Sequence, residues 1–242
     1  MTHRSESGFT ENKNEGSYGL PDAEALRMAH ELVSKWVHQT PVMQSQSLNR
    51  ILGARLWFKC ENFQKAGAFK FRGATHALLR LSPKERAKGV ATHSSGNHAQ
   101  ALALAARMHD CRAFIVMPEN APSIKVAAVR EYGGHIVFCR PTLDDREKTL
   151  AQVISQTGAH EIHPYNDYRI IAGQASAAAE LFQQAGIPDF LIAPVGGGGL
   201  LSGSILSARH FAPSCRVFGS EPLKAADAAA SFQSGVLQPS VN

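Results

Sequence analysis

The sequence has few cysteines, no long apolar run and no segment that resembles a targeting signal. Its four cysteines lie far apart, with no CxxC pair and no histidine at the spacing of a zinc site. No stretch approaches the roughly 18 consecutive apolar residues of a membrane span, and no early apolar run resembles a signal peptide. We expect a protein of the reducing cytoplasm whose thiols are all buried: Cys60, Cys111, Cys139 and Cys215.

The sequence also lacks a block of one charge. The net charge is +5 and the pI is 9.1, but basic residues alternate with acidic ones, as in PKERAK and DDREK. A nucleic-acid platform needs a focused basic face, so we expect no nucleic-acid partner. With 242 residues, of which 44% are hydrophobic, the chain has enough apolar material for one substantial core or two small ones.

Helical patterns and short apolar runs alternate along most of the chain. Residues 1–20 are polar and have no apolar period, so we expect a disordered tail there. A first helix is expected from Pro21, because PDAEALRMAHELVSKWV has apolar residues at helical spacing. The strands expected after it are RLWFKCE, GVATHS, RAFIVM, HIVFCR, AHEIHP, DFLIAPV and CRVFGSE. The other helices are expected to begin near Ala68, Asn97, Ser123, Leu143, Arg169 and Leu200.

Strands that alternate with helices are typical of a parallel sheet with crossover helices. The expected strands are mostly apolar on both faces, as required when helices cover both sides of a sheet. The expected fold class is therefore α/β, doubly wound. In open sheets of this class, ligands bind beyond the carboxyl ends of the strands. Three polar or glycine-rich segments of the sequence lie at such ends.

The first of these segments is GAFKFRGA, which follows the strand RLWFKCE. Lys70 lies in the first turn of the expected helix, where the helix dipole disfavours a charged ammonium and lowers its pKa. A neutral amine is the nucleophile that a Schiff base requires, and Phe69 and Phe71 would surround it with apolar groups. On position alone, the simpler interpretation is a solvated lysine such as Lys84.

The second segment is THSSGNHAQALALAAR, which follows the strand GVATHS. Gly96 permits a tight turn, and Ser94, Ser95, Asn97 and the first helical N–H groups together suit a carboxylate or a phenolic oxygen. The alternative is a simple capped helix start, because Ser and Asn are preferred N-cap residues. Capping explains only one of these polar side chains. His98 on its own is expected to be a structural, hydrogen-bonded residue.

The third segment is PVGGGGLLSGSILSA, which follows the strand DFLIAPV. Its successive glycines expose backbone N–H groups, and the next helix adds its dipole. A phosphate is therefore the expected ligand. Gly197, Gly199 and Gly203 also form GxGxxxG, a relaxed dinucleotide fingerprint, with Glu221 as a partner for a ribose hydroxyl. A dinucleotide oxidoreductase is therefore the rival interpretation. Against it, such a fingerprint normally follows the first strand of its domain.

Several ordered blocks resemble the fold-type II pyridoxal-phosphate enzymes, in particular serine racemase and the threonine/serine dehydratases. The blocks are FKCENFQKAGAFKFRGA, THSSGNHAQALA, MPENAPSIKVAAVREYGG, RIIAGQ and PVGGGGLLSG. The resemblance implies two α/β lobes of the tryptophan synthase β type, with the site between them. The large lobe would comprise residues 21–87 and 167–242, and the small lobe residues 88–166.

The resemblance also implies which residues form the site. Lys70 would be the Schiff-base lysine, Phe69 would pack beside the cofactor ring, and Asn97 would hydrogen-bond its phenolic oxygen. The backbone N–H groups of the glycine loop would bind its phosphate: Gly196, Gly197, Gly198, Gly199 and Leu200. The SSGNH loop would bind the substrate carboxylate: Ser94, Ser95, Gly96, Asn97 and His98.

The implied reaction begins with removal of the α-proton of serine or threonine, which the cofactor makes acidic. Lys70 would be the base, and Ser95 the second acid/base that racemisation needs on the opposite face. Serine racemase resembles this chain in having Ser at that position, whereas many threonine dehydratases have Ala. The serine at position 95 therefore favours a racemase. Loss of the β-hydroxyl would instead give a 2-oxo acid and ammonia, and we expect both outcomes on serine.

The segment SEPLKAADA resembles the divalent-cation segment of the same family. Matched residue by residue, it implies Mg²⁺ or Ca²⁺ bound by Glu221, the carbonyl of Ala225, and Asp227. Oxygen donors of this kind suit a hard cation. The alternative is a solvated loop after a strand.

The resemblance ends with the sequence at Asn242, whereas relatives continue for several more strands and helices. That part normally supplies the group that faces the pyridine nitrogen, so we expect a C-terminally truncated large lobe. A second hypothesis is therefore a non-catalytic relic that folds and binds the cofactor without turnover. A complete protein of this family is expected to be a homodimer.

Overall fold

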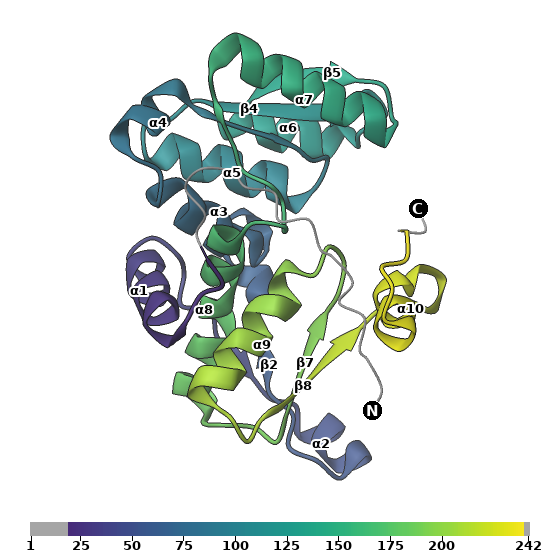
Figure 1. Cartoon of the computed structure of the whole chain (residues 1–242). Coiled ribbons are helices and arrows are strands. Elements are labelled where there is room, and N and C mark those ends of the chain that lie inside the picture. Colours follow the sequence, from purple (N-terminus) through teal and green to yellow (C-terminus); the bar gives the residue numbers. More distant parts are fainter. Residues whose placement is uncertain (1–18, 240–242) are drawn as a thin grey trace, which may run out of the picture.

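The structure, a computed structural model, describes residues 19–239. The tail expected at residues 1–20 lies almost entirely outside this part of the chain. Figure 1 shows a four-stranded sheet with its helices in the upper part of the molecule, and helices around a two-stranded sheet in the lower part. Parallel strands joined by helices confirm the expected α/β class.

The four-stranded sheet is parallel, with the strand order β5-β4-β3-β6. Its strands are β3 (Val90–His93), β4 (Ala113–Pro118), β5 (His135–Cys139) and β6 (His160–Glu161). The helices around it are α4 (Pro83–Lys88), α5 (Asn97–Met108), α6 (Ser123–Glu131) and α7 (Leu143–Thr157). The last three begin at the residues that the sequence pattern predicts.

Alternate residues of the central strands face opposite helix layers, because successive side chains of a strand point to opposite faces. Val90, Ile115 and Met117 pack into the core that includes α5. Ala91 and Val116 face the core that includes α7. Both faces of β3 and β4 are thus covered, which is why these strands are apolar throughout.

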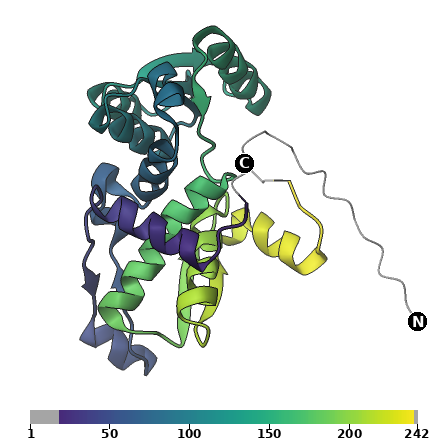
Figure 2. The same ribbon diagram turned by 60° about the vertical axis from the view of Figure 1, so that its left-hand side comes forward.

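The lower part is built around α8 (Tyr168–Ala185), which contacts α1 (Ala23–Ser34), α3 (Lys70–Leu79) and α9 (Gly199–Phe211). Figures 1 and 2 both show α1 and α9 alongside α8. The sheet of this part has two parallel strands, β7 (Phe190–Pro194) and β8 (Arg216–Ser220). One face of this sheet packs against α9.

Glycines allow α3, α8 and α9 to approach one another closely. A Cβ on Gly173 of α8 would lie 2.7 Å from the Cα of Gly73 in α3. A Cβ on Gly203 of α9 would lie 2.7 Å from the backbone nitrogen of Ala175 in α8. Only glycine fits at such distances, so α8 fixes the positions of both neighbouring helices. The starts of α3 and α9 are where the candidate lysine and the glycine loop lie.

Some elements differ from the sequence-based expectation. RLWFKCE contributes only β2 (Phe58–Lys59), which pairs antiparallel with β1 (Val42–Met43) outside both parallel sheets, so a parallel strand there is wrong. The patterns also missed short elements: α2 (Gln46–Leu52), α4 (Pro83–Lys88), α10 (Asp227–Ser234), η1 (Glu61–Phe63), η2 (Lys65–Gly67) and η3 (Leu223–Ala225). Three of the four free cysteines are buried, but Cys60 is only half-buried.

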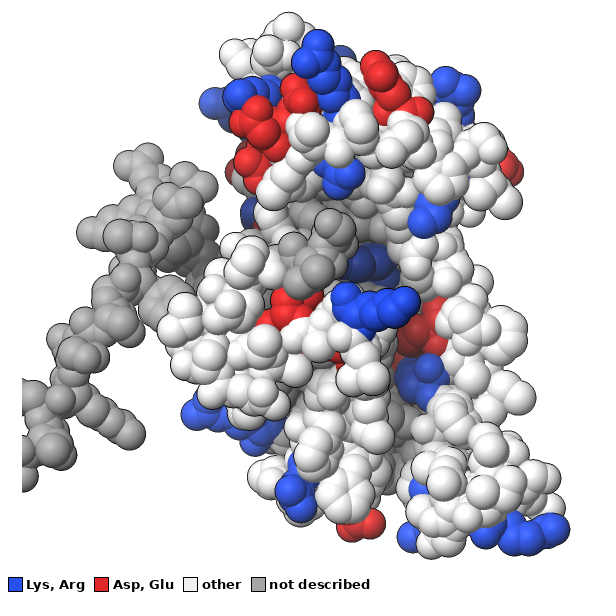
Figure 3. Space-filling model, turned by 90° about the vertical axis from the view of Figure 1, so that its right-hand side faces the viewer, with Lys and Arg blue, Asp and Glu red and all other residues white. Residues whose placement is uncertain are grey.

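Charged side chains are mixed over the surface. On the face in Figure 3, Lys and Arg lie among Asp and Glu with no large area of one sign, and the surface is indented where the upper and lower parts meet. No helix among residues 19–239 has the length and apolar character needed to cross a membrane.

Candidate functional site

Lys70 is the first residue of α3 and so lies in the first turn of the helix, as the sequence pattern predicts. Its Nζ donates a hydrogen bond to the carbonyl oxygen of Pro164 at 2.8 Å and lies 5.4 Å from the ring centroid of Phe69. Burial lowers the pKa of the amine to about 8. A lowered pKa was expected, but from the helix dipole; in the structure, removal from water is the cause.

The SSGNH loop joins β3 to α5, as expected. The Oγ of Ser94 accepts a hydrogen bond from the backbone N–H of Gly96 at 3.3 Å. Gly96 is itself the N-cap of α5, and no side chain caps this helix. The simple capping interpretation is therefore wrong, and the N–H groups of the first turn have no side-chain cap. Asn97, the first helical residue, is exposed.

His98, the second residue of α5, is buried, at 2% exposure. Its Nε2 lies 3.2 Å from the carbonyl oxygen of Ile162, which agrees with a structural role. Its Nδ1 has no hydrogen-bond partner among residues 19–239. Burial, followed by the nearby charge of Lys70, lowers the pKa of His98 to about 3. The ring is therefore neutral at pH 7.

The glycine loop lies between β7 and α9, where an anion would meet the N-terminus of a helix. Gly198 is the N-cap of α9, has φ 85°, and no side chain caps the helix. A Cβ on Gly196 would meet no other atom within 4 Å, and the same holds for Gly198. Open space beside uncapped backbone N–H groups fits a phosphate.

Tyr165 joins this site, although the sequence analysis did not single it out. A Cβ on Gly197 would lie 2.1 Å from Cδ1 of Tyr165, and a Cβ on Gly199 would lie 3.2 Å from its Cβ. The tyrosine therefore lies against the glycine loop, while the carbonyl of the preceding Pro164 holds the amine of Lys70. One dipeptide thus connects the lysine to the loop.

His163 fixes the turn that carries this dipeptide. Its Nδ1 accepts the backbone N–H groups of Tyr165 at 3.3 Å and of Asn166 at 2.8 Å. Its ring also packs edge-on against that of Tyr165, with centroids 4.6 Å apart. The turn follows β6 at the same carboxyl edge of the sheet as SSGNH. That shared edge was the signal in the sequence that could have identified it.

Lys125 of α6 is a second residue that the sequence analysis missed. Its Nζ lies 4.0 Å from the position of a Cβ built on Gly96 of the SSGNH loop. Within the described part of the chain, this ammonium has no ion pair. A free positive charge beside a loop with uncapped N–H groups suits an anionic ligand.

The expected cation segment has an internal hydrogen-bond pattern. The carboxylate of Glu221 accepts the backbone N–H groups of Ala228 at 3.2 Å and of Ala229 at 2.8 Å, at the start of α10. Ala225 ends η3, and Asp227 is the first residue of α10. Among residues 19–239, no three His, Cys, Asp or Glu side chains cluster as a metal site. Glu221 is thus engaged in the turn at the start of α10.

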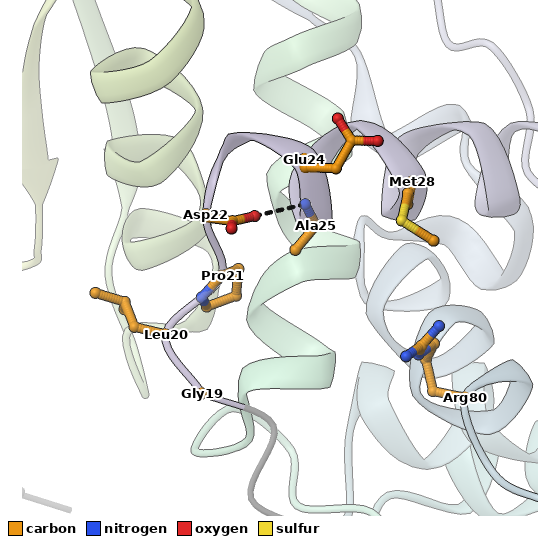
Figure 4. Close-up of a pocket in the computed structure, with 8 residues that line it drawn as sticks. All are labelled: Gly19, Leu20, Pro21, Asp22, Glu24, Ala25, Met28 and Arg80. Atoms are coloured by element: carbon orange, nitrogen blue, oxygen red, sulfur yellow. Dashed lines mark hydrogen bonds between the residues drawn. The ribbon is translucent and has the colours of Figure 1, made fainter.

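A shallow hollow of about 380 Å³ lies at the far end of α3, away from Lys70. Figure 4 shows its lining from the start of α1, with the side chain of Asp22 bonded to the backbone nitrogen of Ala25 at 2.8 Å. Arg80, which follows the last residue of α3, lines the other side. The length of α3 separates this hollow from the lysine, so it is not part of the candidate site.

Lys70, the SSGNH loop and the glycine loop thus lie at one region of the molecule, as the sequence predicts. The residue types fit pyridoxal phosphate: a half-buried amine of lowered pKa for its aldehyde, and a loop of glycines, without side chains in the way, for its phosphate. The outcome agrees with the resemblance of the ordered sequence blocks.

Comparison with known proteins gives the same result. Residues 33–241 match the family model "Pyridoxal-phosphate dependent enzyme". The chain is 47% identical to beta-hydroxyaspartate dehydratase of Paracoccus denitrificans, over 90% of this chain and 69% of that protein. It is 48% identical to serine racemase of Arabidopsis thaliana, over 88% of this chain and 65% of that protein.

A solved structure has the same fold. Maize serine racemase superposes with a TM-score of 0.90 and 44% sequence identity, over 93% of this chain and 69% of that one. This chain spans about two thirds of the length of these relatives. The relatives favour neither the dinucleotide oxidoreductase nor the non-catalytic relic. This chain belongs to the pyridoxal-phosphate-dependent enzymes of fold type II, the family of the serine racemases and threonine dehydratases.

Proposed function

We propose that this protein removes the α-proton of a small hydroxy amino acid, serine or threonine, with pyridoxal phosphate as its cofactor. A proton is then returned on the opposite face, which is racemisation, or the β-hydroxyl leaves as water and the resulting enamine is hydrolysed to a 2-oxo acid and ammonia. The observation that carries the proposal is the link between Lys70 and the glycine loop through Pro164 and Tyr165. The names of the relatives, a racemase and a dehydratase, support both outcomes.

The cofactor would be held by Lys70 at its aldehyde, with Phe69 beside its ring and Asn97 at its phenolic oxygen. The phosphate would lie on the backbone N–H groups of Gly196, Gly197, Gly198, Gly199 and Leu200. When bound, pyridoxal phosphate supplies an electron sink that makes the substrate α-proton acidic. The open space at Gly196 and Gly198 supports this placement.

The remaining steps belong to side chains of this chain. The substrate carboxylate would bind at the SSGNH loop, through Ser94, Ser95, Gly96, Asn97 and His98. We add the ammonium of Lys125, which faces Gly96 without an ion pair of its own among the described residues. Lys70 would take the α-proton, since burial keeps much of its amine neutral near pH 8. Ser95 would return a proton from the opposite face.

We further propose a Mg²⁺ or Ca²⁺ site at Glu221, the Ala225 carbonyl and Asp227. Each carboxylate oxygen has a lone pair beyond the one that accepts a backbone N–H, so Glu221 retains capacity for a cation. Thermal unfolding with Mg²⁺ and with chelator tests the site. The difference in melting temperature should vanish in Glu221→Gln.

The broader setting is also proposed from the family pattern. It includes a large lobe of residues 21–87 and 167–242, a small lobe of residues 88–166, a homodimer, and a cytoplasmic location. The free cysteines support a reducing compartment.

Spectroscopy and two assays test the proposed function. The purified chain, incubated with pyridoxal phosphate, should develop the visible absorbance band of a lysine-bound cofactor. Lys70→Ala should lack the band, whereas Lys65→Ala, five residues earlier in η2, should keep it. Serine racemisation and pyruvate release, measured in one sample, then give the ratio of the two outcomes. A band that persists in Lys70→Ala would contradict the proposal.

A further inference from the structure

A network of buried ion pairs lies behind Lys70, on the other side of α3. Arg72 is fully buried, and its Nε and Nη2 donate to the two carboxylate oxygens of Glu61, both at 2.8 Å. Its Nη1 and Nη2 also donate to the carboxylate of Glu180 in α8, at 3.1 Å and 2.9 Å. Lys59 binds Glu180 from β2. The positive charges of two cations and the negative charges of two carboxylates therefore cancel inside the protein.

The start of α3 lacks the usual side-chain cap. Its N-cap residue is Phe69, which makes no side-chain capping bond. Arg72 is the third residue of the helix, and its planar guanidinium joins this first turn to Glu61, 11 positions earlier. The segment between Glu61 and Arg72 is thus a loop closed at its ends by a bidentate ion pair. Lys70 lies inside this closed loop.

The side chains of Arg72 and Lys70 point in different directions from the same helical turn. Residues two apart on a helix point in roughly opposite directions, so Arg72 points to the network while Lys70 points to the carbonyl of Pro164. Rotation or fraying of the first turn would move both side chains together. Fixing one therefore fixes the other.

We propose that Glu61, Arg72 and Glu180 position Lys70, by holding the first turn of α3 so that its amine stays bonded to the carbonyl of Pro164. This inference rests on the proposed role of Lys70 and adds three positioning residues that do not touch the reacting groups. Burial of ion pairs by itself stabilises proteins little, and apolar residues often replace them without loss. A planar guanidinium that binds a carboxylate through two parallel hydrogen bonds does, however, fix the orientation of its side chain.

Reductive methylation of the whole chain, without pyridoxal phosphate, tests the proposal. The label attaches to neutral amines, and peptide mass spectrometry reports on Lys70 alone. Because burial lowers the pKa of Lys70 to about 8, labelling of the wild type should be half-maximal near that pH. In Glu61→Gln, which keeps the side-chain shape but removes the charge, we expect the midpoint to rise by about one pH unit. Arg72→Lys keeps the positive charge but loses the bidentate hydrogen bonds to Glu61. It should shift the midpoint in the same direction.

Lys59→Met is the matched control. It removes a cation that bonds Glu180 but no residue of α3, so it should lower the melting temperature yet leave the midpoint of Lys70 near pH 8. The side chain of Glu61 is 14% exposed, so Glu61→Gln carries the test if Arg72→Lys does not fold. An unchanged midpoint in folded Glu61→Gln, or an equal shift in Lys59→Met, would overturn the proposal. Since no cofactor is present, this failure is distinct from loss of the absorbance band.

Discussion

The properties of Lys70 arise from which groups cover it. Its place at a helix start could be predicted from the sequence. The burial that lowers its pKa could not, because the covering carbonyl belongs to Pro164, 94 positions later in the chain. A helix-start lysine in water would keep an ordinary pKa, since a solvated dipole has a small effect. Tertiary packing therefore decides whether this lysine is a nucleophile.

Lys125 provides a test at the same scale. Replacing it by methionine keeps much of the side-chain length and removes the charge that faces Gly96. A partly exposed charge pair contributes about 1 kcal/mol, so we expect KM for the amino-acid substrate to rise about fivefold. Because Lys125 would bind carboxylate in the ground state and in the transition state alike, kcat should change less than twofold.

The control for this variant is Lys84→Met, on the exposed surface of α4. Steady-state kinetics of both variants, at low and high salt, are the measurement. The KM of Lys84→Met should match the wild type, and the effect of Lys125→Met should shrink at high salt. A fall in kcat with no change in KM would refute a role of Lys125 in substrate binding.

At the scale of elements, the close contacts of α8 hold the site together. Gly203 is the most direct test, because a Cβ there would lie 2.7 Å from the nitrogen of Ala175 and 2.8 Å from the carbonyl oxygen of Ile171. Both are backbone atoms and cannot move aside. We expect Gly203→Ala to destabilise the protein by about 3 kcal/mol and to lower Tm by roughly 9 °C.

Gly196→Ala serves as the control for stability, because a Cβ at that position meets no other atom within 4 Å. Thermal unfolding followed by circular dichroism should show a Tm close to that of the wild type. Equal destabilisation by the two substitutions would mean that the α8–α9 crossing is not a tight contact.

The elements that the sequence predicted best are those with a long apolar period. Helices α5, α6 and α7 begin where their apolar patterns begin, and β4 is a continuous apolar run because both of its faces are covered. The pair β1–β2 was missed because two strands of two residues each carry no period. Close helix crossings at glycines were missed for a different reason. A lone Gly in a helical pattern does not say which neighbour comes near.

At the scale of the whole molecule, buried histidines make folding sensitive to acid. Burial lowers the pKa of His98 to about 3 and that of His76 to about 4, while both would titrate near 6.5 in the unfolded chain. Between these values the unfolded chain binds protons that the folded one does not, so stability falls as pH drops below about 6.5. At pH 5.5 we expect a loss of roughly 2–3 kcal/mol relative to pH 7.5.

The buried carboxylate of Glu180 adds to this effect at lower pH. Burial alone would raise its pKa, but hydrogen bonds and charge from Arg72 and Lys59 outweigh burial and lower it. Its stabilisation is thus present above its unfolded pKa and lost as pH falls through the lower folded value. Urea unfolding at several pH values between 7.5 and 4 measures the whole dependence. A flat profile from pH 7.5 to pH 5 would contradict the buried, neutral state of both histidines.

The candidate site depends on the whole fold, because its parts come from segments far apart in the sequence. The sequence predicted Lys70, SSGNH and the glycine loop as chemical groups, since each lies after an expected strand. It did not predict that Pro164 and Tyr165 connect Lys70 to the glycine loop, because this contact depends on how the turn between β6 and α8 packs against the start of α9. Motifs therefore gave the site residues, and packing gave their arrangement.

The most direct test of the central claim is to find which residue holds the cofactor. The whole chain is incubated with pyridoxal phosphate, reduced with borohydride, digested, and mapped by mass spectrometry. We predict the reduced cofactor on the peptide that contains Lys70, with Lys65 of the same loop unmodified. Label spread evenly over exposed lysines, with no excess at Lys70, would contradict the claim that this lysine is the cofactor-binding residue.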